Sequence, residues 1–179
     1  MPKRRVRRHE VTQPPNESYR LIPLTQNQNA IVDSADFEWL SQWNWYAHWN
    51  PHTRSFYARR NSRINGKKGI LRMHRILLCC GPNEEGDHHN HDTLDNRREN
   101  LRRCTRLENA KNIRTPATNT SGYKGVYRSG ARWRVMIRVN RKLVHYGRFS
   151  TAENAARAYN EAATIHFGEF AHLNPLPLS

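Results

Sequence analysis

The alternation of apolar and polar residues is clearest over residues 132–139, Arg-Trp-Arg-Val-Met-Ile-Arg-Val. A period of two predicts a β-strand with one apolar and one basic face. The apolar face carries Trp133, Val135, Ile137 and Val139, and the opposite face carries Arg132, Arg134, Met136 and Arg138. The first face suits a core, and the second suits phosphates or base edges.

A helix is predicted directly after this strand region. Asn140-Arg141 begins a turn into a further strand that ends near Phe149, and Ser150 with Glu153 forms a capping box that opens the helix. The helix is rich in alanine, which allows close packing on a sheet, and Gly168 ends it.

Residues 18–80 predict a small sheet with one short helix. Apolar runs at 21–24 and 30–32 predict strands, and Ser34 can cap a helix that reaches about Gln42. Asn65-Gly66 is a strong two-residue hairpin signal. Trp43, Trp45 and Trp49 alternate with polar residues, as in a strand. We expect these tryptophans to build a core, with a base-stacking platform as the alternative.

Composition narrows the partner to a polyanion. The 179 residues include 30 Lys and Arg against 15 Asp and Glu, a formal net charge of +15. The sequence has no long apolar run and no signal-peptide pattern, so nucleic acid fits better than a membrane, and we expect an intracellular protein acting on cytoplasmic, nucleoid or host-cell DNA. The cysteines, Cys79, Cys80 and Cys104, form no Cys-x-x-Cys pair, so no structural zinc is expected.

The segment from Asp87 to Asn109 carries the candidate chemistry. It combines a carboxylate, a neighbouring imidazole and several spaced Asn amides. These donors suit one hard divalent cation with positions left open for water and phosphate. A neutral His beside such a site can activate water as a general base. Arginines flank the segment and would hold a polyanion: Arg97, Arg98, Arg102, Arg103 and Arg106.

This segment resembles the HNH homing endonucleases with Asn in the last position. The resemblance rests on Asp87-His88, on Asp95-Asn96-Arg97-Arg98-Glu99-Asn100-Leu101 and on Glu108-Asn109. It implies a ββα-metal unit in which Asp87 and Asn109 bind the cation, most simply Mg²⁺, with Mn²⁺ as an alternative. His88 would be the general base, and Asn100 would brace the loop and orient that base. A capping box from Thr105 to Glu108 predicts a helix that begins near Arg106.

The C-terminal region resembles the AP2 DNA-binding domain of plant-type regulators. The matching residues are Tyr123-Lys124-Gly125-Val126, Trp133, Ile137-Arg138, Gly147-Arg148-Phe149, Thr151 to Tyr159, Ala162-Ala163 and Gly168. The resemblance implies a three-stranded antiparallel sheet that enters the major groove and is backed by one helix. By position, Lys124, Arg134 and Arg138 would contact DNA, and Arg128, Arg132, Arg141 and Lys142 are further candidates. Tyr127, Leu143 and His145 depart from the family pattern, so no target sequence is inherited.

Together these patterns predict an α+β protein with four parts. They are a basic arm without fixed structure (1–17), a nuclease domain (18–112, with a sheet at 18–80 and the ββα-metal unit at 81–112), a linker (113–120) and an AP2-like domain (121–174). The arm either lies along DNA or is a solvated tail. We predict a monomeric, metal-dependent nicking endonuclease of the homing type, carried by a phage or mobile element, that acts on double-stranded DNA. The alternatives are a non-enzymatic AP2-type regulator with an inactive nuclease unit, and an RNA-binding protein.

Overall fold

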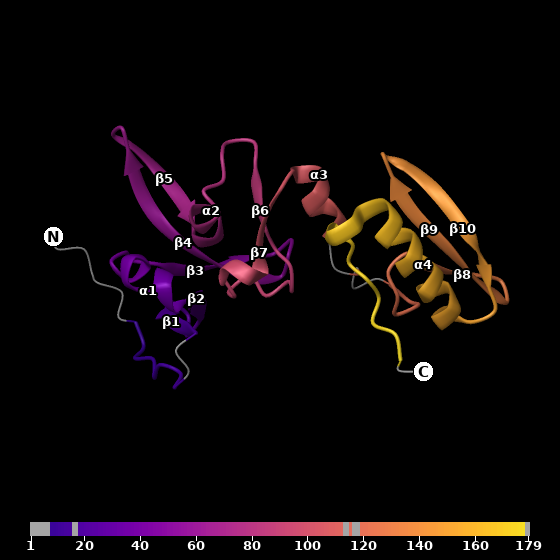
Figure 1. Ribbon diagram of the computed structural model, residues 1–179, viewed down its shortest axis with the longest axis horizontal. Helices are drawn as coiled ribbons and strands as arrows, with labels where there is room; N and C mark the ends of the chain where they lie inside the picture. Colours follow the sequence, from indigo (N-terminus) through magenta and orange to yellow (C-terminus); the bar gives the residue numbers. More distant parts are fainter. Residues whose placement is uncertain (1–7, 16–17, 113–114, 116–118, 178–179) are drawn as a thin grey trace. The chain divides into compact units, whose positions relative to one another are not determined.

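A computed structural model describes residues 8–15, 18–112, 115 and 119–177 (Figure 1). The chain divides into two compact units, Met1–Thr105 and Arg106–Ser179. The division falls inside the segment predicted as the ββα-metal unit, so the short helix after Thr105 is grouped with the C-terminal region. The predicted linker lies largely outside the described residues. None of the helices in the described ranges is both long and apolar enough to cross a membrane.

The first unit contains three small antiparallel sheets instead of one N-terminal sheet followed by a nuclease hairpin. β1 and β2 form the first, β3-β4-β5 the second in that order, and β6 and β7 the third. Two short helices follow β2 and β5, and a 3-10 turn precedes β7. The elements are β1 (Tyr19–Pro23), β2 (Asn29–Asp33), α1 (Ser34–Ser41), β3 (Tyr46–Asn50), β4 (Ser55–Ile64), β5 (Lys67–Arg72), α2 (Met73–Leu77), β6 (Glu85–His88), η1 (Arg98–Asn100) and β7 (Leu101–Cys104).

The predicted hairpin at Asn65-Gly66 is present between β4 and β5. Both residues have positive φ, 49° and 75°, as a type I′ turn requires. The tryptophan core formed only in part. Trp45 is buried among the core residues of this unit, whereas Trp43 and Trp49 are 44% and 46% exposed. Only Trp49 lies on a strand, because β3 begins after Trp45.

The described part of the predicted N-terminal arm contacts the first unit. Arg8 Nη2 donates to Trp45 O over 3.0 Å, and His9 Nε2 lies 2.8 Å from Asn29 Oδ1. The Gln13 amide exchanges two hydrogen bonds with the backbone of Leu21. Arg8, His9 and Gln13 are therefore joined to the first unit by side-chain hydrogen bonds, and the arm as a separate part of the chain stays a prediction. Residues 1–7 and 16–17 lie outside the described residues.

The second unit has the predicted three-stranded antiparallel sheet, in the order β10-β9-β8, with one helix packed on it (Figure 1). Val135, Ile137 and Ala155 are buried between sheet and helix, which confirms the predicted apolar face. The helix is capped by Thr151, whose side chain accepts from Asn154 N, and not by Ser150 as predicted. The elements are α3 (Arg106–Asn109), η2 (Ala110–Asn112), β8 (Val126–Ser129), β9 (Arg132–Val139), β10 (Lys142–Phe149), α4 (Ala152–Phe167) and η3 (Gly168–Phe170).

Candidate active site and nucleic-acid interface

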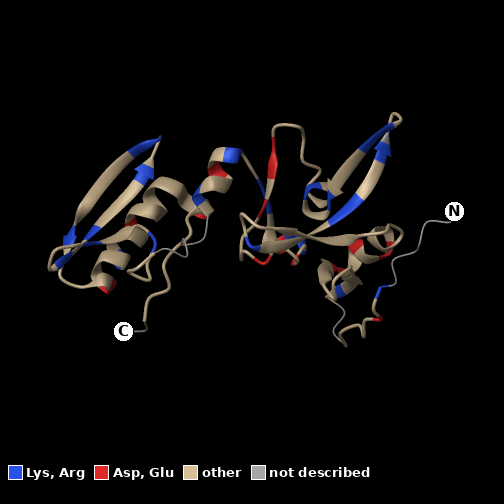
Figure 2. Ribbon diagram, turned by 180° about the vertical axis from the view of Figure 1, so that it is seen from behind, with Lys and Arg blue, Asp and Glu red and all other residues tan. Residues whose placement is uncertain are grey.

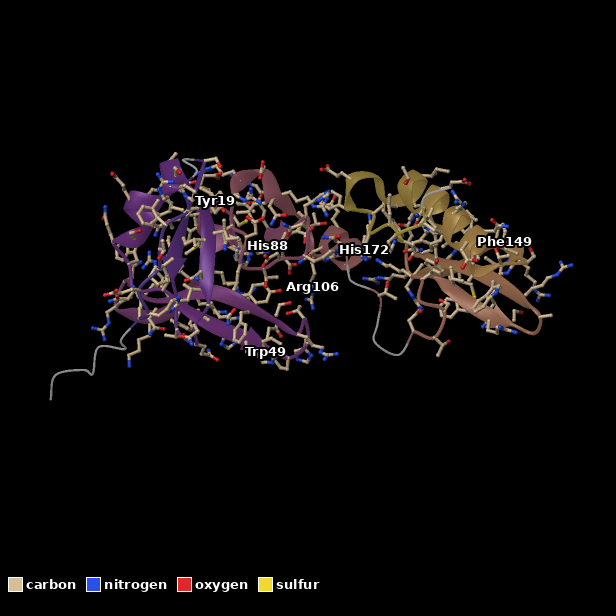
Figure 3. The ribbon with its side chains drawn as sticks, turned by 90° about the horizontal axis from the view of Figure 1, so that it is seen from below. Tyr19, Trp49, His88, Arg106, Phe149 and His172 are labelled. Atoms are coloured by element: carbon tan, nitrogen blue, oxygen red, sulfur yellow. The ribbon has the colours of Figure 1, made fainter. Side chains whose placement is uncertain are left out.

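The β6–β7 hairpin holds the Asp87-His88 pair at the end of β6. Asp87 lies opposite Arg102 on β7, and His88 lies opposite Leu101. Both side chains are buried, with 7% and 4% of their surface exposed. Figure 3 shows His88 within the first unit, surrounded by neighbouring side chains. A buried carboxylate next to a buried imidazole is an arrangement that folding alone does not favour, because both groups lose hydration.

Asn100 braces the loop that connects the two strands. Its side-chain oxygen accepts from Asn90 N over 2.9 Å, and its amide nitrogen donates to Asp95 O over 2.8 Å. Its backbone oxygen accepts from His89 N over 2.9 Å. These three bonds hold the chain directly after His88. The contribution of Asn100 to catalysis stays a prediction.

The same loop is fastened to the β1–β2 hairpin. Ile31 N donates to Leu94 O over 2.9 Å, and Asn96 N donates to Ile31 O over 2.7 Å. Asn96 is buried, and its amide nitrogen donates to Leu94 O. The Asn96 side chain also opposes the lowering of the His88 pKa. The loop that follows His88 is therefore held in place by a distant part of the sequence, the β1–β2 hairpin.

Two aromatic rings complete the surroundings of His88. The His74 ring on α2 meets it edge to face with 4.8 Å between centroids, and the Tyr57 ring on β4 lies 6.2 Å away. Gly86 permits this packing, since a Cβ atom there would come within 2.7 Å of His74 Cδ2. Neither residue was predicted to belong to the site, because α2 and β4 are distant from His88 in the sequence.

Burial decides the charge state of both histidines. It lowers the pKa of His88, and the hydrogen bond with Asn96 and the nearby carboxylates of Asp87, Asp92 and Asp95 oppose that shift. Burial also holds the pKa of His74 well below its usual range, with a further lowering by His88 and neighbouring arginines. Both rings are therefore neutral at neutral pH. A neutral imidazole can accept a proton.

Three arginines predicted to contact DNA pair with carboxylates inside the first unit. Arg102 donates to Asp87 Oδ2 through Nε at 2.9 Å and Nη2 at 2.7 Å. Arg97 makes a bidentate pair with Asp95, and Arg98 makes one with buried Asp36 on α1. Asp36 was not predicted to take part, because 62 residues separate it from Arg98. These guanidinium groups support the loop and the hairpin that carry His88.

The Asp87 carboxylate is a donor of the kind that a hard cation prefers, and a site with few protein ligands leaves coordination positions for water. No group of three or more His, Cys, Asp or Glu suited to a metal ion occurs in the part of the chain that the structure describes. Asn109, the second predicted ligand, is the last residue of α3 and belongs to the second unit. Its role as a ligand stays a prediction.

The basic face of the second unit lies on β9, opposite α4. Arg132, Arg134 and Arg138 are exposed there, and the Arg134 guanidinium lies 5.9 Å from the centre of the Tyr127 ring. Figure 2 shows Lys and Arg along these strands. Arg141 lies in the β9–β10 turn with a φ of 66°. The sheet thus presents three of the predicted DNA contacts on one exposed face.

Arg128 and Lys142 lie elsewhere on this sheet. Register pairs Arg128 with Trp133 and Lys142 with Val139, so both belong to the face that carries α4, at its exposed margin. Lys124 is mostly buried, and its Nζ donates to Lys111 O over 2.8 Å. Burial lowers the pKa of Lys124 to about 8. The DNA contacts predicted for these three residues stay predictions.

A β-bulge adds Arg148 to the basic face. Lys142 to His145 pair with β9 in one register, and after Tyr146 the register shifts so that Arg148 lies opposite Arg134. Without the shift Arg148 would lie on the face with Trp133. Tyr146 and Phe149 both pack against the core of this unit. Their spacing of three residues, with Gly147 between them, was the signal in the sequence for this bulge.

Comparison with known proteins fits both parts of this geometry. Residues 78–111 match the HNH endonuclease family. This HNH-like segment includes Asp87, His88 and Asn109. A stretch of 40 residues is 45% identical to an ethylene-responsive transcription factor-like protein of Arabidopsis thaliana, and it covers 22% of this chain and 18% of that protein. The HNH match supports a nuclease, and the second match supports DNA binding by an AP2-like sheet.

Proposed function

We propose that the protein is a metal-dependent endonuclease of the homing type that nicks one strand of duplex DNA. The observation that carries the proposal is the buried Asp87-His88 pair, held at the end of β6 within a segment that matches HNH endonucleases. One such pair per chain suits the cutting of one strand by a monomer.

His88 acts as the general base in this proposal. Its lowered pKa keeps the ring neutral at neutral pH, so that a ring nitrogen can take a proton from the attacking water. The His74 ring packs edge to face on the His88 ring and so limits its rotation. Asn100 supports the same orientation through the backbone that follows His88.

Asp87 and Asn109 would hold the divalent cation, with Mg²⁺ as the first candidate and Mn²⁺ as the second. Oxygen donors with few protein ligands suit these ions. When bound, the cation supplies stabilisation of negative charge on phosphate and leaving-group oxygens. Arg102 holds the Asp87 carboxylate in a buried ion pair.

The AP2-like sheet docks the enzyme on DNA. A β-sheet can enter the major groove, and Arg132, Arg134 and Arg138 lie on the exposed face that would do so. Arg148, opposite Arg134, extends that face beyond the predicted contacts.

Plasmid nicking tests the proposed function. Supercoiled plasmids bearing a library of candidate targets are incubated with the full chain and Mg²⁺ or EDTA. We expect relaxed circles with Mg²⁺ alone, and His88→Ala should lower the rate by about 10²–10⁴ with DNA affinity retained. His89→Ala is the matched control, because His89 is the adjacent but exposed histidine. Equal rates for His88→Ala and the wild type would reject His88 as the base.

The pH dependence of nicking tests the same role. A general base must be neutral, so the rate should rise with pH with a midpoint below about 6.5, the ordinary pKa of histidine. DNA binding without any cleavage would favour the alternative, an AP2-type regulator with an inactive nuclease unit. The named Arabidopsis relative supports that alternative, since its name describes a transcription factor-like protein.

A further inference from the structure

The β3-β4-β5 sheet of the first unit has a basic face that the proposed function does not use. The opposite face packs on the core through Ala47 and Ala58. Register places Tyr57, Arg59 and Arg63 of β4 on the first face, with Arg72 opposite Arg59 and Lys68 opposite Arg63. We call this set, Tyr57, Arg59, Arg63, Lys68 and Arg72, the basic face of the first unit. Arg63, Lys68 and Arg72 are exposed.

The basic face lies in a part of the chain that lacks acidic residues. From Trp39 to Asn83 the sequence has eight Lys and Arg and no Asp or Glu. Figure 2 shows the corresponding hairpin with blue segments and no red ones. Arg97, Arg98 and Arg102 near the candidate active site pair with carboxylates. The strands β3, β4 and β5 carry no Asp or Glu that could pair with their arginines.

The arrangement is unfavourable for the folded protein by itself. Arg59 faces Arg72 and Arg63 faces Lys68 directly across the strands, and like charges in such pairs destabilise a sheet. The Nε of Arg59 is buried and finds no hydrogen-bond partner within the described residues. Buried donors are normally satisfied. An anion placed on this face would relieve the repulsion between the facing cations.

The basic face is continuous with the candidate active site. Tyr57 belongs to the face, and its ring lies 5.9 Å from His74 and 6.2 Å from His88. Arg59 follows Tyr57 on the same face of β4, and Arg72 lies directly opposite Arg59. A polyanion bound along β4 would therefore reach His88 at one end.

The shape of the hairpin fits duplex DNA. β4 and β5 form a two-stranded ribbon with a turn at Asn65-Gly66 (Figure 1). The major groove admits such a ribbon. Arg59 and Arg63 are four residues apart, which places them roughly 13 Å apart along the strand. That distance allows contacts with more than one phosphate.

We infer that the basic face of the first unit binds duplex DNA and delivers the phosphodiester to His88. The first unit then has its own DNA-binding surface, besides the AP2-like sheet of the second unit. The inference deepens the proposed function and rests on it for the role of His88. The binding surface itself is testable without cleavage.

Salt-dependent binding of the full chain to random-sequence duplex DNA in EDTA tests the surface. Log K falls as log salt rises, and Lys68→Gln and Arg72→Gln should each make this negative slope shallower by about 1. The binding constant falls with roughly the 0.9 power of the salt concentration for each phosphate contact. Loss of one contact should therefore weaken binding by about eightfold at 0.1 M salt. Lys67→Gln is the matched control. Lys67 is an exposed neighbour on the same strand, but it pairs with Ile64 on the other face.

The outcomes separate the surface from the enzyme. Equal changes for Lys67→Gln and Lys68→Gln, or no change for Arg72→Gln, would overturn the inference even when the wild type nicks plasmids. A slope change with duplex RNA but not with duplex DNA would overturn it as well. A shallower salt dependence of DNA binding for Lys68→Gln and Arg72→Gln supports DNA binding by the basic face of the first unit. If the same wild-type preparation then fails to nick plasmids, that result counts against the proposed function alone.

Discussion

Arginine is abundant in both units, but it is used in different ways. Near the candidate active site, Arg97, Arg98 and Arg102 each bind a carboxylate that is itself buried. On the second unit's sheet, the guanidinium of Arg134 lies against the Tyr127 ring, and Arg138 donates to the Arg141 carbonyl. The first group stabilises the fold around His88, and the second remains directed at solvent.

This difference separates support from recognition. A guanidinium paired with a buried carboxylate satisfies a charge that the protein must neutralise. A guanidinium on an exposed strand contributes little to stability and is open to a phosphate or a base edge. A basic run in the sequence therefore predicts binding only after its acidic partners are known.

The largest effect is expected at Arg102. Its side chain and that of Asp87 are 13% and 8% exposed, so Arg102→Ala leaves a buried carboxylate without its partner. The free energy of unfolding should fall by about 3 kcal/mol, measured by urea denaturation. Lys67→Ala, an exposed residue of the same unit, should change it by less than about 0.5 kcal/mol. Similar losses of unfolding free energy for Arg102→Ala and Lys67→Ala would contradict a structural role for Arg102.

A smaller, pH-dependent effect is expected at Arg98. The hydrogen bonds from Arg98 lower the pKa of Asp36, so the pair stabilises the fold above the ordinary Asp pKa of about 3.9, and the contribution disappears as pH falls through the lowered value. Because Arg98 is 59% exposed, Arg98→Ala should cost only about 1–2 kcal/mol at pH 7. Denaturation curves at pH 7 and below pH 3 measure the change. A cost that stays constant with pH would contradict this account.

The smallest effect on stability is expected on the second unit's sheet. Arg134→Gln and Arg138→Gln should each change the free energy of unfolding by less than about 0.5 kcal/mol. Each should also reduce the salt slope of DNA binding by about 1. Titrations at several salt concentrations, with Arg157→Gln on α4 as an exposed control, measure this. A large loss of stability with an unchanged slope would assign these residues to support instead.

Local patterns predicted much of the fold. The alternation over 132–139, the Asn65-Gly66 turn and the alanine-rich helix each depend on residues close in sequence, and the structure has all three. The α+β class follows from the same patterns. The predicted helix caps were each wrong by one residue, since Asp33 and Thr151 stand at the N-cap positions predicted for Ser34 and Ser150.

The candidate site was predictable in its chemistry but not in its supports. The spacing of Asp87, His88, Asn100 and Asn109 suggested a metal-dependent nuclease, because these residue types occur within one short segment. His74 and Tyr57 approach His88 from α2 and β4, and Gly86 makes room for His74. Contacts of this kind depend on how the sheets pack.

The sequence by itself determined the elements, the charge and the residues that can perform chemistry, because each depends on residue type and local period. Only the tertiary structure decided which arginines are neutralised. Asp36 reaches Arg98 across 62 residues, and a single bulge moves Arg148 to the face of Arg134. The physical reason is that an ion pair or a strand register depends on distances in space, and periodicity along the chain does not contain them.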